Sequence, residues 1–136
     1  MEFKKSTIVY IDDIRNPLEQ SHIDISGYDN VVWVKSYVEF CNWLFENGLP
    51  DSISFDHDLH ENHYAPKEHW VGTYRLWRKE NPNVFPTGLD CAKTLVDYCK
   101  EHDLQLPIWS VHSSNPIGSY EITEVLMTYA EKYYLR

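Results

Sequence analysis

Short apolar runs alternate with amphipathic segments along most of the chain. β-branched apolar runs at residues 7–11, 31–34, 52–55 and 106–111 predict four strands. The first run is nearly continuous and ends at two aspartates, which is typical of a strand buried on both faces. The polar residues 14–30 predict a long loop or a short irregular helix.

Helical spacing of apolar residues predicts three helices. The first runs from about residue 37 to 47, between a Ser36 cap and Gly48. The second begins at Thr87 or Gly88 and ends near residue 102, and the third runs from residue 116 or 117 to near the terminus. The expected inward positions are Val38, Cys41, Leu44 and Phe45 in the first helix, Leu89, Ala92, Leu95, Val96 and Cys99 in the second, and Ile122, Val125, Leu126 and Tyr129 in the third.

Strands that alternate with helices predict an α/β fold with a parallel sheet covered by helices on both faces. One segment departs from this pattern. Residues 59–86 are of mixed polarity, with Trp70, Trp77 and three histidines, and predict an insertion with a short helix near residues 71–79. The length of 136 residues fits a single domain over residues 1–136.

Composition and charge exclude several classes of protein. Aromatic residues at 15% and hydrophobic residues at 43% are too many for a disordered acidic chain. With 12 basic against 21 acidic residues, the formal charge is −9, which argues against non-specific binding to DNA or anionic lipid. No signal-type segment or long apolar run is present, so we expect a soluble cytoplasmic protein in which Cys41, Cys91 and Cys99 are reduced core thiols.

Reactive polar residues follow three of the four predicted strands. They are Asp12 and Asp13, then residues 56–58, then residues 112–115. Because ligands of open α/β sheets bind beyond the carboxyl ends of the strands, we expect these clusters to share one crevice.

The acids and histidines of this crevice suggest a metal or proton-transfer site. Asp12, Asp13 and Asp56 would repel one another unless Mg²⁺ or a proton offsets their charge. His57 and His112 are the candidate acid and base, and they would transfer protons in an in-line attack if both faced one phosphate. The alternative is structural, since strand-end aspartates cap helices and histidines satisfy hydrogen bonds.

Further residues of the crevice are candidates for holding a phosphate. Arg15 could bind it in bidentate fashion, or could instead form an ion pair with Asp13 or Asp58. Thr87 and Gly88, like Ser113 and Asn115, precede predicted helices, whose amides favour anions but whose caps are ordinarily Ser, Thr or Asn.

Four motifs occur in order along the chain and together resemble one family. They are Asp12-Asp13-Ile14-Arg15-Asn16-Pro17, Ser54-Phe55-Asp56-His57-Asp58-Leu59, Thr87-Gly88-Leu89-Asp90 and Val111-His112-Ser113-Ser114-Asn115-Pro116-Ile117-Gly118. This set resembles the signature of the cyclic-phosphate processing receiver-like domain family. The resemblance implies a flavodoxin-like three-layer fold with about four mostly parallel strands. It also implies a metal pocket of Asp12, Asp13 and Asp56, with His57, Asp58 and His112 as the residues that distinguish the family.

These observations favour a phosphoesterase that acts on a cyclic nucleotide or on a 2′,3′-cyclic phosphate at an RNA end. Two alternatives stay open: a module that binds the same ligand without cutting it, and a receiver that binds proteins through Trp70 and Trp77. An ordinary phosphorylated receiver is disfavoured, because the sequence predicts neither a fifth strand nor a lysine at its end.

Overall fold

The strands form one parallel sheet in the order β2-β1-β3-β4. The computed structural model describes residues 6–19, 25–59 and 87–135. The elements are β1 (Thr7–Ile11), the 3₁₀ turn η1 (Pro17–Glu19), β2 (Asn30–Val34), α1 (Tyr37–Asn47), β3 (Ser52–Phe55), α3 (Gly88–His102), β4 (Ile108–Val111) and α4 (Pro116–Tyr134). The expected α/β architecture with four parallel strands is therefore confirmed.

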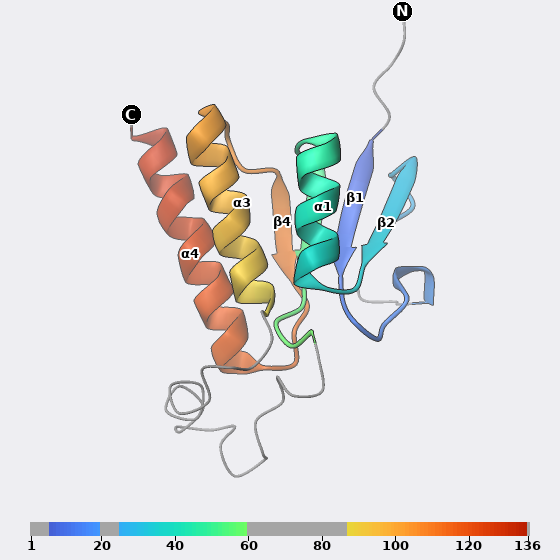
Figure 1. Ribbon diagram of the computed structural model, residues 1–136. Helices are drawn as coiled ribbons and strands as arrows, with labels where there is room; N and C mark the ends of the chain where they lie inside the picture. Colours follow the sequence, from blue (N-terminus) through green and yellow to red (C-terminus); the bar gives the residue numbers. More distant parts are fainter. Residues whose placement is uncertain (1–5, 20–24, 60–86, 136) are drawn as a thin grey trace, which may run out of the picture.

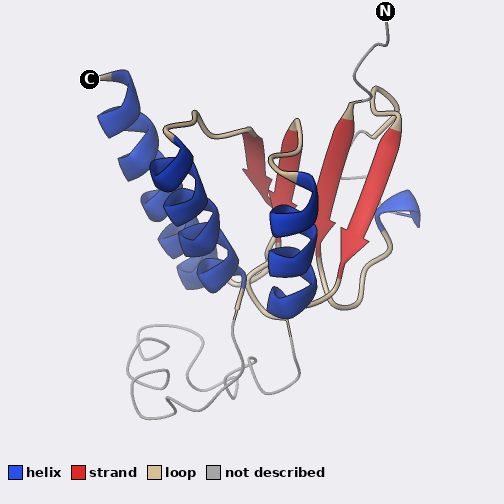
Figure 2. Cartoon of the chain, turned by 45° about the horizontal axis from the view of Figure 1, so that its top comes forward, coloured by secondary structure: helices blue, strands red, loops and turns tan. Residues whose placement is uncertain are grey.

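The three helices lie side by side on one face of the sheet (Figures 1 and 2). Helix α3 packs between α1 and α4. The sequence led us to expect helices on both faces, but no described helix covers the second face. The reason lies in the connection from β1 to β2, where residues 12–19 and 25–29 form turns and the short η1 instead of a crossover helix.

Alternation along the strands separates two sets of side chains. Val9, Ile11, Ile53 and Phe55 point toward the helices and join the core with residues of α1, α3 and α4. The intervening residues Ile8, Tyr10, Ser52 and Ser54 are also buried, but they point to the opposite face. This alternation continues past the strand ends, where the polar residues begin.

The helix boundaries match the sequence expectation closely, because each helix has a strong cap. The Ser36 side chain accepts from the Glu39 amide at the start of α1, and Gly48 ends this helix with a positive φ. Thr87 and Asp90 form a capping box at the start of α3, and the Asn115 side chain caps α4.

The inward face of α1 differs from the expectation. Phe40 and Leu44 are fully buried, whereas Val38 and Phe45 are 63% and 65% exposed. Val38 lies two positions from Phe40, roughly 160° around the helix, so both cannot face the sheet. In α3, Cys91 and Cys99 are buried free thiols as expected, and Cys41 in α1 is half-buried.

The insertion proposed for residues 59–86 falls almost entirely outside the described residues, as do Trp70, Trp77 and the short helix expected near residues 71–79. Leu59, its first residue, is buried in the core. None of the described helices combines the length and the apolar character needed to cross a membrane.

Candidate functional site

Asp12, Asp56 and His112 come together at the carboxyl edge of the sheet. Each directly follows a strand and continues its ladder, since the Asp12, Asp56 and His112 amides donate to backbone carbonyls of the neighbouring strands. All three side chains therefore fall on the face away from the helices. One ligand atom from each lies within 4.8 Å of the others. The expected convergence of the three strand ends is present for these residues.

Arg15 neutralises this cluster from within the protein. Its Nε lies 2.7 Å from Asp12 Oδ2, and its Nη2 lies 3.4 Å from Asp56 Oδ1. Its Nη1 also donates to the His112 carbonyl at 3.4 Å. The ion pairs are thus with Asp12 and Asp56, where the sequence suggested Asp13 or Asp58, and the guanidinium is largely engaged.

Asp12 is held in its ionised form. Its Oδ1 accepts from the Ile14 and Arg15 amides at 2.9 Å each, and its Oδ2 contacts Arg15 and His112. Burial opposes ionisation, but the hydrogen bonds from His112 and from the two amides outweigh it, so the pKa of Asp12 is lowered.

His112 has both ring nitrogens engaged inside the protein. Nδ1 lies 2.6 Å from Ser54 Oγ, and Nε2 lies 3.1 Å from Asp12 Oδ2. The ring also stacks on Tyr10, with centroids 4.3 Å apart and planes 6° apart. Ser110 donates to Ser54 and so favours a Ser54 hydroxyl that donates to Nδ1, which leaves the Nε2 proton for Asp12. This geometry suits a residue that orients Asp12.

His57 lies on the helix-facing side of the same edge. Its Nδ1 is 2.9 Å from Asp58 Oδ1, and Asn115 Nδ2 donates to Asp58 Oδ2 at 3.4 Å. The ring packs directly on the backbone of Gly118 in the first turn of α4, where an added Cβ would lie 2.4 Å from His57 Cγ. A carboxylate at Nδ1 fixes the neutral ring as the Nδ1–H tautomer and leaves Nε2 without a proton.

The two histidines therefore occupy opposite ends of one polar network. It runs from His112 through Asp12 and Arg15 to Asp56, whose Oδ1 accepts from the His57 amide at 2.9 Å, and then through His57 to Asp58. The two rings lie on opposite faces of the sheet edge, so the arrangement does not favour the attack by both histidines on one phosphate that the sequence suggested as a conditional possibility. The alternation of side chains along the strands explains this difference. Residue 57 continues the helix-facing series of β3, which includes Ile53 and Phe55. Residue 112 follows the helix-facing Val111 of β4 and therefore points to the opposite face.

Asp13 and Asp56 are the carboxyl groups of this edge whose ionised forms are least stabilised. Within the described part of the chain, Asp13 Oδ1 is buried and has no hydrogen-bond partner. Burial raises the pKa of Asp13, and the charges of Asp12 and Asp58 act in the same direction. Burial also raises the pKa of Asp56 to about 7, and Asp12 adds to this shift while Arg15 opposes it. An orphaned carboxylate oxygen such as Asp13 Oδ1 fits a hard divalent cation.

The sequence candidates for phosphate binding all have structural partners. The Gly88 amide donates to the His57 carbonyl at 2.7 Å, and the Thr87 side chain accepts from the Leu89 amide. Ser113 Oγ accepts from the Asn115 amide. The Asn115 side chain is shared between the Gly118 amide and Asp58. These residues cap and connect elements, which is the alternative that the sequence left open.

Sequence reasoning missed Tyr10 and Ser54 as parts of the site. Both are buried and contact His112 directly. The signal was present, because they stand two positions before Asp12 and Asp56 and so share their face of the sheet.

Comparison with known proteins gives one match. The family model for the cyclic-phosphate processing receiver domain matches residues 7–128, nearly the whole chain. No curated protein and no solved structure matches significantly. The matched range contains all four motifs and both ends of the polar network, and the chain belongs to the family of cyclic-phosphate processing receiver domains.

Proposed function

We propose that this protein is a phosphoesterase that opens a cyclic phosphate, either in a cyclic nucleotide or at an RNA end. The observation that carries the proposal is the His57–Asp58 pair, buried where α3 and α4 begin and joined to the aspartate cluster. A histidine whose Nδ1 is fixed by a carboxylate presents Nε2 as a base, the arrangement that general base catalysis requires.

The chemistry assigned to His57 is proton removal from water. As the water oxygen bonds to phosphorus, the bond from phosphorus to one ring oxygen breaks. His57 Nε2 takes the water proton, and the departing oxygen takes a proton from solvent. Asp58 stabilises the imidazolium that forms, and Asn115 positions Asp58. His112 acts at a distance by holding Asp12, and through Arg15 it sets the position of Asp56.

A divalent cation such as Mg²⁺ fits the acidic edge of this site. Asp12 and Asp56 would hold it, since both offer ligand atoms in the cluster at the sheet edge, and the orphaned oxygen of Asp13 is a further candidate ligand. When bound, the cation would neutralise charge on a phosphate oxygen.

Turnover of a defined panel tests the proposal. Purified protein with MgCl₂ is incubated with 2′,3′-cyclic AMP, 3′,5′-cyclic AMP and a short RNA that ends in a 2′,3′-cyclic phosphate, and the products are resolved by chromatography. We expect hydrolysis of at least one substrate, and a loss of about 100-fold or more in kcat in His57→Gln, the scale of general base catalysis.

His102→Gln is the matched control, because His102 is an exposed histidine of the last turn of α3. It should retain full activity. The melting temperature of each variant separates loss of catalysis from loss of folding. Unchanged substrates across the panel would overturn the phosphoesterase proposal, and recovery of intact bound ligand would favour a binding module.

A further inference from the structure

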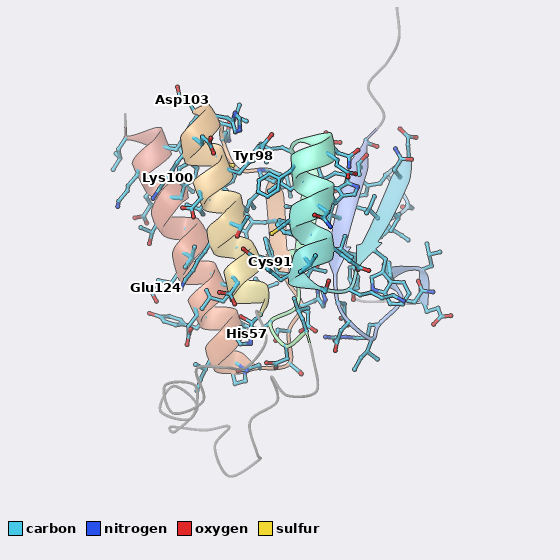
Figure 3. The ribbon with its side chains drawn as sticks, viewed as in Figure 1. His57, Cys91, Tyr98, Lys100, Asp103 and Glu124 are labelled. Atoms are coloured by element: carbon cyan, nitrogen blue, oxygen red, sulfur yellow. The ribbon has the colours of Figure 1, made fainter. Side chains whose placement is uncertain are left out.

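A groove runs along the outer surface between α3 and α4, and His57 contributes to its lining. Its volume is about 740 Å³, within the range of sites that enclose a small organic ligand. Val96 and Val125 line its apolar part. His57 lies at the end where both helices begin, and Lys100 lies toward the other end (Figure 3).

The groove holds most of the basic side chains in the part of the chain that the structure describes. Five lysine and arginine residues fall in the described ranges, and three of them, Lys93, Lys100 and Lys132, line this groove. Among the described residues no ion pair is found for these three lysines, although Asp97, Glu121 and Glu124 also line the groove. Unpaired ammonium groups are available to bind phosphate oxygens.

The three lysines lie at increasing distances from His57 along the two helices. Gly88 and Gly118 lie in the first turns of α3 and α4, and both pack against His57, so distances along the helices are counted from them. At 1.5 Å per residue, Lys93 lies about 8 Å along α3 from Gly88. Lys100 lies about 18 Å along α3, and Lys132 about 21 Å along α4 from Gly118. A ligand with its phosphate at His57 would therefore meet Lys93 first and the other two lysines only if it were longer.

We infer that the α3–α4 groove is the binding site for the nucleotide portion of the substrate. The ligand class is a ribonucleotide with a cyclic phosphate, either free or at the end of an RNA chain. Lys93 binds next to the cyclic phosphate, and Lys100 and Lys132 bind further backbone phosphates of an RNA. The Asp97 and Glu124 carboxylates accept hydrogen bonds from ribose hydroxyl and base amino groups. This inference rests on the proposed function for the identity of the ligand.

Charge-removing variants test the groove in the intact protein. Turnover and direct binding, the latter by fluorescence anisotropy, are measured for 2′,3′-cyclic AMP derivatives and for a six-nucleotide RNA with a cyclic phosphate end. Lys93→Gln should raise KM and Kd about tenfold for both ligands, with little change in kcat. The double variant Lys100→Gln/Lys132→Gln should weaken only the RNA and reduce the salt dependence of its binding.

Two further variants complete the test. Lys35→Gln removes the same charge from a lysine that lies over Trp33, outside the groove, and should leave every constant unchanged. Thr128→Trp fills the groove from an exposed position of α4 and should raise Kd for both ligands without lowering the melting temperature.

The outcomes separate the two proposals. An active enzyme whose constants are the same in the groove variants and in Lys35→Gln would overturn the groove while leaving the phosphoesterase intact. An inactive protein that binds the ligands through Lys93 would support the groove and overturn catalysis. Absence of binding to any of these ligands would overturn the groove as well.

Discussion

At the scale of single residues, the two histidines of the site differ in what holds them. His112 is fixed by Ser54, Asp12 and the Tyr10 ring. His57 is fixed by Asp58 and by the backbone of α4. His57 also lines the groove between α3 and α4. These surroundings agree with the proposed roles, in which His112 orients Asp12 and His57 transfers the proton.

Removal of the Ser54 hydroxyl should measure how firmly His112 is held. Ser54→Ala leaves Nδ1 of a nearly buried imidazole without its 2.6 Å partner, and we expect a loss of about 1–3 kcal/mol in the free energy of unfolding. Urea denaturation measures this. Ser52→Ala is the control, since Ser52 is buried on the same strand and face without a described side-chain partner, and should cost less. Equal losses in the two variants would contradict the assigned contact.

Asp56 should make stability depend on pH in a definite direction. Its pKa is raised from an ordinary value near 3.8 to about 7 in the folded protein. Well below pH 4 the group is protonated in both states and carries no penalty. As the pH rises toward 7, the unfolded chain loses this proton first, so the stability contributed by Asp56 falls and then levels off above pH 7.

Asp56→Asn removes that dependence. In buffer with EDTA, the variant should be more stable than the natural protein at pH 8, by at most about 4 kcal/mol, and the gain should shrink toward pH 4. Thermal unfolding at pH 4, 6 and 8 provides the measurement. A difference in stability that stays constant across this range would show that Asp56 ionises normally.

At the scale of elements, two glycines let the helices approach the end of β3. An added Cβ at Gly88 would lie 1.7 Å from the Asp56 carbonyl oxygen, and one at Gly118 would lie 2.4 Å from His57 Cγ. The starts of α3 and α4 are therefore in van der Waals contact with the functional residues. This close packing fixes the backbone of residues 56 and 57 from the helix side.

Gly88→Ala should disrupt this packing. The overlap is with backbone, which cannot rotate away, so α3 must shift and we expect a loss of about 3 kcal/mol or more. Gly27→Ala is the control, because an added Cβ there meets nothing within 4 Å and the backbone φ is not positive. Circular dichroism during urea denaturation compares them. A Gly88→Ala protein as stable as Gly27→Ala would refute the close approach.

The bounds of the helices were more predictable from the sequence than the side of each helix that is buried. The bounds of α1 and α3 follow from local chemistry, since Ser36, Gly48 and the Thr87 capping box act within one turn. The buried stripe of α1 depends on where the helix crosses the sheet, and local spacing could not distinguish Val38 from Phe40. The α3–α4 groove arises from lateral packing of two helices, which no local pattern encodes.

At the scale of the whole molecule, the sequence predicted which residues gather at the candidate site better than it predicted how their side chains are arranged there. Strand ends rich in Asp and His indicated the edge of the sheet correctly. Strand alternation, which the sequence reasoning did not consider, sends His57 to one face of this edge and His112 to the other. Charge of both signs lines the groove, where Lys93, Lys100 and Lys132 stand with Asp97, Glu121 and Glu124, whereas the described sheet edge gathers buried acids.

The buried thiols should report whether this chain unfolds as one domain. Cys91 and Cys99 lie in α3 at the centre of the core, and burial raises the pKa of Cys91 well above its usual value and that of Cys99 to about 11. At pH 8, a thiol reagent should therefore modify the half-buried Cys41 quickly and the other two only through unfolding. Peptide mass spectrometry assigns each rate, and Cys41→Ser should abolish the fast phase alone.

In rising urea, the two slow rates should increase in parallel with the global transition. Different urea dependences for Cys91 and Cys99 would instead show that part of α3 opens separately, and rapid labelling of all three thiols would contradict the single core.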